Sequence, residues 1–224
     1  FQHGGLFDMR LFSPEDHLNE KYSDLNFLWH NKNGIGAPYF FKTSLKNFDN
    51  ENKILFFPTA TLFQEETENL KLCNHLNLNQ YLKLIPLLND KLLNLHVKFA
   101  NDQTSKIAKK LWIKRFGKKI KIVENNYKGD IFNKFSLTII DNFSTPFFEL
   151  MYNKQPFVIL NNSKLKEFKP EFKKIISNLK KNKILFNNEI ELANFINENF
   201  SNFKKYWTDV INSKYFINIR KKIF

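Results

Sequence analysis

The feature that most constrains the fold of this chain is a regular alternation of short apolar runs and longer amphipathic segments, which begins at Lys53. The apolar runs are too short for helices and suit strands that are buried on both faces. The predicted strands are Ile54–Phe57, Leu95–Phe99, Ile120–Val123, Leu137–Ile140, Phe157–Leu160 and Ile184–Phe186. Strands that alternate with helices form a parallel sheet covered on both faces. We therefore predict an α/β fold with a doubly wound parallel sheet of about five or six strands.

The segments between these runs predict helices, because their apolar side chains recur every three or four residues. Gly117 follows one such segment and is the residue type that most often stands just after a helix. Asn188 and Glu191 have the spacing of a capping box at a helix start. The predicted helices are Asn79–Leu93, Thr104–Phe116, a short segment Gly129–Phe135, one from Thr145, Glu171–Lys181, one after Asn188, and a last one from about Asn202 towards the end.

Residues 137–160 form the unit that bears most directly on function, a strand, a polar turn, a short helix and a second strand. Ser144 or Thr145 can cap the helix, and Pro146 suits its first position because its missing N–H would be unpaired there. A strand that feeds a helix start in this way makes an anion pocket from free backbone N–H groups and the positive end of the helix dipole. Glu149 lies about one turn further along, where its carboxylate can accept hydrogen bonds from a ribose diol.

Asp141 admits two interpretations. Together with Glu149 it can form a carboxylate pair, but Asp141-Asn142 is also an ordinary turn signal, so a turn or capping role for Asp141 is at least as well supported.

Two further candidates lie on the same predicted edge, since right-handed crossovers place every strand-to-helix loop of such a sheet on one side. Thr59 and Thr61 follow the first strand, and their hydroxyls can hold a phosphate. Lys98, near the end of another strand, can neutralise a diphosphate. Alone, each signal is weak, because short polar loops are common and most lysines are simply solvated. The sequence has neither a dinucleotide fingerprint nor a P-loop motif.

His3-Gly4-Gly5 is the second notable motif. An imidazole at a strand end, on a backbone turned tightly by two glycines, suits a general base near neutral pH. A single loop histidine is more often structural. The remaining histidines show no ligand spacing with Cys73 or with one another, so we expect no metal site.

The formal net charge is +13, with lysine-rich groups at Lys106–Lys121 and Lys204–Lys222. A solvated basic surface is the simplest explanation, attraction to anionic lipid headgroups comes next, and nucleic acid comes last because no binding motif accompanies the charge. The only cysteine, Cys73, fits a reducing compartment. No apolar run approaches the ~18–20 residues of a membrane span. These features predict a cytoplasmic protein, with peripheral contact to the inner face of a membrane as an option and no nucleic-acid partner.

Three stretches together resemble a known family. They are QHGG at Gln2–Gly5, HLNEKYSDLNFLWH at His17–His30 and FSTPFFELMYNKQPFVIL at Phe143–Leu160. They are similar to transferases of surface-carbohydrate biosynthesis, in which a QHGG-type loop precedes an acidic residue, a Ser-Asp pair and a Trp. The positions that match are Gln2 to Gly5, Glu20, Ser23, Asp24, Trp29, Thr145, Glu149, Leu150, Pro156 and Val158, and the C-terminal end around Tyr206-Trp207 and Arg220 also resembles the family's.

A more distant resemblance connects the chain to polyol-phosphate polymerases of teichoic-acid type, and two departures bear on it. Lys98 stands where relatives carry an Arg, so a bidentate phosphate contact is lost. Phe99-Ala100 replaces a His-Pro pair of the teichoic-acid enzymes, which favours a nucleotide-sugar donor over a polyol-phosphate donor.

The resemblance implies a glycosyltransferase of the GT-B type, which moves a sugar from a nucleotide-activated donor to a surface-glycan precursor, either a glycan or a lipid-linked acceptor. It implies His3 as the catalytic base, donor contacts from Gly4, Gly5, Thr59, Thr61, Lys98, Ser144, Thr145 and Glu149, and no cofactor or metal. The alternative is a non-catalytic Rossmann-like module that binds a nucleotide or glycan or scaffolds a complex.

The start of the chain, FQHGG, reads as the end of a strand running into a loop, and it has no Met. We therefore expect a fragment, which need not be active alone. Residues 1–50 are interpreted as a remnant of an N-terminal acceptor domain with its linker, 51–201 as a Rossmann-like donor-binding domain, and 202–224 as a basic amphipathic helix.

Overall fold

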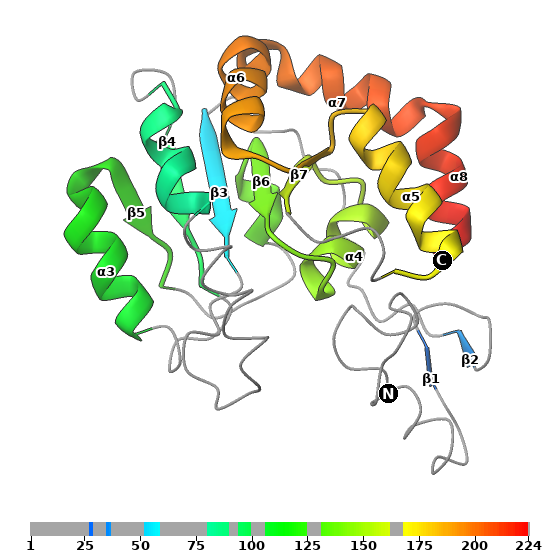
Figure 1. Cartoon of the computed structure of the whole chain (residues 1–224), viewed down its shortest axis with the longest axis horizontal. Helices are drawn as coiled ribbons and strands as arrows, with labels where there is room; N and C mark the ends of the chain where they lie inside the picture. The colour runs from blue at the N-terminus through cyan, green and yellow to red at the C-terminus, as the bar shows by residue number, and fades with distance from the viewer. Residues whose placement is uncertain are drawn as a thin grey trace.

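The computed structural model describes residues 27–28, 35–36, 52–58, 80–89, 94–99, 106–124, 131–161 and 168–223. Its centre is a six-stranded sheet in the order β5-β4-β3-β6-β7-β8, in which every neighbouring pair is parallel (Figure 1). The strands are β3 (Lys53–Phe57), β4 (Asn94–Val97), β5 (Ile120–Ile122), β6 (Leu137–Ile140), β7 (Phe157–Leu160) and β8 (Leu185–Phe186). A separate parallel pair joins β1 (Phe27–Leu28) to β2 (Ile35–Gly36). The predicted α/β fold is confirmed.

Helices connect and flank these strands. They are α3 (Lys106–Phe116), α4 (Thr145–Tyr152), α5 (Pro170–Lys181), α6 (Glu189–Asn199), α7 (Phe203–Asn212) and α8 (Lys214–Ile223), with the 3₁₀ turns η1 (Gly117–Lys119), η2 (Ile131–Lys134) and η4 (Phe200–Asn202). Residues 80–87 are also helical. The chain steps outward from β3 to β5, returns to the centre at β6 and then steps the other way to β8. Right-handed crossovers in two opposite directions place helices on both faces, as a doubly wound sheet requires.

The register divides the sheet into rows of side chains, because alternate residues of a strand point to opposite faces. One row crosses five strands on a single face and consists of Lys121, His96, Leu55, Thr138 and Phe157. On this face the His96 ring contacts Phe135 at 5.2 Å, and Phe157 contacts Phe147 of α4 at 5.9 Å. This face is therefore covered by α4 and by the segment around η2.

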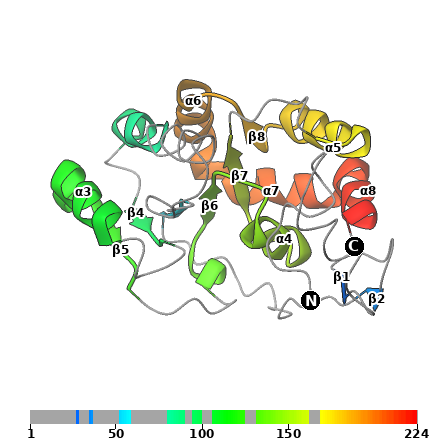
Figure 2. The ribbon, with the colours of Figure 1, turned by 60° about the horizontal axis from the view of Figure 1, so that its bottom comes forward.

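The opposite face is covered by residues 80–87, α3 and α6. Phe56 of β3 contacts Tyr81 at 5.8 Å and Trp112 of α3 at 6.5 Å, all three being fully buried. At the other end of the sheet Phe186 of β8 contacts Phe195 of α6 at 5.2 Å. Figure 2 shows α6 and α4 on opposite sides of the central strands.

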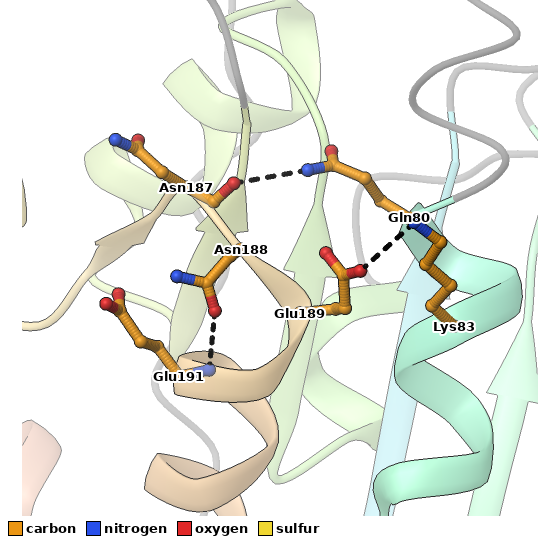
Figure 3. A network of polar contacts seen from close by, with 6 residues as sticks. All are labelled: Gln80, Lys83, Asn187, Asn188, Glu189 and Glu191. Atoms are coloured by element: carbon orange, nitrogen blue, oxygen red, sulfur yellow. Dashed lines mark hydrogen bonds and ion pairs between the residues drawn. The ribbon is translucent and has the colours of Figure 1, made fainter.

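Polar contacts join residues 80–87 to the start of α6 (Figure 3). The Gln80 amide donates to the carbonyl of Asn187 at 3.3 Å, and Lys83 pairs with Glu189 at 3.6 Å. The Asn188 side chain accepts from the N–H of Glu191 at 2.8 Å, so the predicted N-cap of α6 is confirmed. These contacts fix two helices that are about a hundred residues apart in the chain.

The structure differs from the predicted elements in two places. The helix predicted for Asn79–Leu93 ends at residue 87 in the described part, since the backbone N–H of Asn89 instead donates to the Asn197 side chain at 3.0 Å. The single C-terminal helix is divided at Ser213, whose backbone is extended and whose hydroxyl accepts from the N–H of Phe216 at 3.4 Å as the cap of α8. Gly117 has φ +52°, which agrees with its predicted role at a helix end.

Candidate functional site

The junction between β6 and α4 is built as a tight polar turn. The Asn142 side-chain oxygen accepts from the backbone N–H of Ser144 at 3.2 Å and from its hydroxyl at 2.5 Å. Because the Ser144 hydroxyl is used in this turn, it does not cap α4. Pro146 lies in the first turn of α4, as its second residue rather than at the predicted first position. The start of α4 therefore keeps the positive end of its dipole without a side-chain cap, which is the arrangement that binds anions.

Glu149 lies one turn beyond Thr145 on the same helix. It is only 7% exposed, and its Oε2 atom has no hydrogen-bond partner. Burial raises the pKa of this carboxyl to about 7. A buried carboxyl oxygen without a donor costs free energy, which makes Glu149 a candidate for contact with a ligand.

Lys98 follows β4 and is 2% exposed. Its backbone N–H donates to the carbonyl of Phe56 at 2.9 Å, which continues the ladder by one residue. Since it stands two residues after His96, strand alternation assigns its side chain to the sheet face that carries α4. β3 separates β4 from β6, so Lys98 and the β6–α4 turn are two strand spacings apart, about 10 Å. The same edge of the sheet thus carries a cation and an uncapped helix start.

Asp141 is buried on the other side of the sheet. It follows β6 on the face that carries Phe56 and Ile139, and it is 2% exposed. Burial raises the pKa of Tyr81 well above its usual range, and the charge of Asp141 raises it further. The backbone carbonyl of Asp141 accepts from the Asn161 amide. The place of Asp141 on the sheet face opposite to α4 argues against a carboxylate pair with Glu149.

The carboxyl end of α4 is held by residues of α7 and α8, and no pattern in the sequence indicated these contacts. Arg220 of α8 donates to the carbonyls of Met151 and Tyr152, and the indole N–H of Trp207 donates to the carbonyl of Lys154 at 2.8 Å. The Trp207 ring also contacts Phe157 of β7 at 5.4 Å. In the sequence, Trp207 and Arg220 were singled out only because they resemble the C-terminal end of the family described above.

The remaining predicted site residues, which are His3, Gly4, Gly5, Thr59 and Thr61, lie outside the described residues. In the part that the structure describes, no group of three or more His, Cys, Asp and Glu side chains is arranged to hold a metal ion. None of the described helices combines the length and the apolar character that crossing a bilayer requires.

Comparison with known protein families gives a match that covers nearly the whole chain. The model of the family described as "LIC12162 family transferase" matches residues 1–213. No curated protein matches the sequence.

Proposed function

Because this chain belongs to the LIC12162 family of transferases, we propose that it is a glycosyltransferase of the GT-B type that uses a nucleotide-activated sugar. In this proposal residues 51–201 bind the donor, and the acceptor is a precursor of a surface glycan of the cell envelope. The family supports transferase activity, and the parallel sheet with its ligand edge supports binding of a nucleotide. Sugar, acceptor and GT-B type are inferred from the resemblance described above.

The single observation that carries the proposal is Glu149, a buried carboxyl whose Oε2 atom has no hydrogen-bond partner and which lies one turn from an uncapped helix start. In its ionised form the carboxylate has acceptor sites for both hydroxyls of a ribose. The diphosphate then lies between the start of α4 and Lys98, which contribute backbone N–H groups and a positive charge. The same groups stabilise the negative charge that grows on the leaving diphosphate during transfer, and this is a large term in catalysis of such reactions.

The proposal can be tested by isothermal titration with nucleoside diphosphates. Glu149→Ala is expected to weaken binding by about 1–3 kcal/mol, the usual cost of losing hydrogen bonds to a charged group. Glu191, an exposed acid in α6, provides the matched control, and Glu191→Ala is expected to leave the affinity unchanged. If both variants remain folded and bind the nucleotide as tightly as the unchanged chain, Glu149 does not bind the ribose.

Protonation gives a second, independent readout. Ribose hydroxyls bind the ionised carboxylate, and Glu149 has a pKa of about 7, so nucleotide binding is expected to release a proton near pH 7. Titration in two buffers of different ionisation enthalpy measures this release. It should disappear in Glu149→Gln and persist in Glu191→Gln.

We propose His3 as the base that takes the proton of the acceptor hydroxyl, because imidazole is suited to this near pH 7. Gly4 and Gly5 would leave room for a bulky acceptor. In an assay of sugar transfer, His3→Ala is expected to lower turnover by roughly 10²–10⁴ with nearly constant nucleotide affinity. A variant that keeps most of its turnover excludes His3 as the base, and nucleotide binding without any transfer favours the non-catalytic module.

A further inference from the structure

One flank of the molecule carries more than half of the net charge of the chain. Residues 106–124, which comprise α3, η1 and β5, contain eight Lys or Arg residues and one Glu, a net charge of +7 out of +13. β5 is one of the two edge strands of the sheet, and this segment lies on the side opposite to α5 and α8 (Figure 1). We call residues 106–124 the basic flank.

Six cations of the basic flank are exposed to solvent. They are Lys110, Lys114, Arg115, Lys118, Lys119 and Lys121. The only acid in the segment, Glu124, already pairs with Lys109 at 2.9 Å. Lys110 and Lys114 stand one turn apart on α3, and like charges in this position destabilise a helix. An anionic partner would relieve this repulsion.

Two exposed aliphatic side chains accompany the cations. Leu111 is 49% exposed and Ile113 is 52% exposed, and they are two of the five large apolar residues that are exposed in the described part of the chain. By helical geometry they flank the line of Lys110 and Lys114, one on each side. Helices that lie on membrane surfaces combine lysines with exposed apolar residues, so that the charges meet lipid phosphates and the apolar groups enter the headgroup boundary.

Protection of the sheet edge is a simpler explanation for part of this charge. Lysine on an edge strand discourages pairing with another chain, and this accounts for Lys121 on β5. It does not account for the cations on α3 or for Leu111 and Ile113, because these residues lie on a helix and not on the edge strand.

Nucleic acid is a weaker candidate for this surface. Proteins that bind single strands combine cations with exposed aromatic rings on which bases stack. The aromatic residues described in the basic flank are Trp112 and Phe116, which are 0% and 7% exposed. Both pack inward, where the Trp112 ring contacts Phe116 at 5.7 Å.

We propose that the basic flank docks the protein onto a bilayer that contains anionic lipid. η1 precedes β5 and therefore lies at the amino-terminal edge of the sheet, away from the edge where Lys98 and the start of α4 lie. A membrane on this flank leaves the proposed donor edge open. The inference rests on charge and exposure of the flank and does not require the proposed glycosyl transfer.

The test is co-sedimentation of the full chain with vesicles of phosphatidylcholine alone and of phosphatidylcholine with phosphatidylglycerol. We expect binding only to the anionic vesicles and a steep loss with added salt. The triple variant Lys110→Gln, Lys114→Gln and Arg115→Gln should lower the partition coefficient roughly 100-fold, because each cation near such a surface contributes a factor of about 5. Leu111→Ser with Ile113→Ser should lower it roughly tenfold.

A matched control removes the same number of charges elsewhere. Lys204, Lys205 and Lys214 are exposed on α7 and α8, and their triple change to Gln should lower binding much less. Equal losses in both triple variants would show attraction to net charge alone and overturn the proposal. The proposal would also be overturned if the protein did not bind anionic vesicles at low salt. It would likewise be overturned if the protein bound an oligonucleotide more tightly than the vesicles and this binding resisted salt. Circular dichroism of each variant confirms that the fold is retained.

Discussion

Arg220 holds the carboxyl end of α4 by donating from Nε to the carbonyl of Met151 at 3.0 Å. Its Nη2 donates to the carbonyl of Tyr152 at 2.8 Å. The last carbonyls of a helix have no partner within it, and a cation there complements the negative end of the helix dipole. The C-terminal helix of the chain thus fixes α4 at one end, while its other end is the proposed anion site.

Loss of this contact is expected to lower stability. Arg220→Ala should reduce the free energy of unfolding by about 2 kcal/mol, because two charge-assisted hydrogen bonds are removed. Arg220→Lys should cost about 1 kcal/mol, since lysine keeps the charge but not the forked geometry. Urea denaturation measures both. The neighbouring Lys221 is exposed, and Lys221→Ala should stay within about 0.5 kcal/mol. An equal effect at both positions would contradict the assigned role of Arg220.

The buried carboxyl of Glu149 predicts a pH-dependent stability. Its pKa is raised from 4.5 in a free side chain to about 7 in the fold. Between these values the folded state binds more protons than the unfolded state, so the stability from this group falls as pH rises through 7. Relative to the unchanged chain, Glu149→Gln should therefore gain about 2–3 kcal/mol more at pH 8 than at pH 5. Denaturation at both pH values checks this, and an identical difference at both would contradict the raised pKa.

The N-cap of α6 gives a prediction with a close control. Asn188→Ala should lower the free energy of unfolding by about 1 kcal/mol, because the N–H of Glu191 loses its acceptor. Asn187 is exposed and contributes only its backbone carbonyl to the contact with Gln80, so Asn187→Ala should have little effect. Thermal denaturation of the two variants distinguishes the loss of an N-cap from the loss of any polar side chain at this turn.

Lys154 has φ +55° at the turn between α4 and β7, a conformation that a side chain disfavours. Lys154→Gly should leave stability within about 0.5 kcal/mol, because relief of this strain offsets the entropy of glycine. Lys154→Val should lower it by about 1–2 kcal/mol. At the exposed helical residue Lys174 the order should reverse, with glycine the more damaging substitution. The same order at both positions would contradict the assigned conformation.

Local signals were enough to predict the sheet. Each predicted strand falls within two residues of an observed one, because buried parallel strands are short apolar runs that polar turns separate clearly. The unit of residues 137–160 was predicted best. Its turn, its first-turn proline and its helix all depend on neighbours in sequence, and the structure contains all three.

Features that depend on distant contacts were not visible in the sequence. The burial of Lys98 follows from its place beside β3, and the clamp of Arg220 and Trp207 on α4 joins residues more than fifty positions apart. The break at Ser213 was missed because its flanks share one amphipathic pattern, so periodicity alone gives a single helix. Ser213 was a usable signal, since serine is favoured as an N-cap.

The strand order has a consequence for how the chain acquires its structure during synthesis. β3 lies between β4 and β6, but β6 follows it by some eighty residues. When the ribosome has released β3, β4 and β5, one side of the apolar strand KILFF is still an open edge, and it stays open until β6 has emerged. Unpaired apolar edges favour association with other chains. During the interval between the emergence of β5 and that of β6, this edge is therefore exposed to association with other chains.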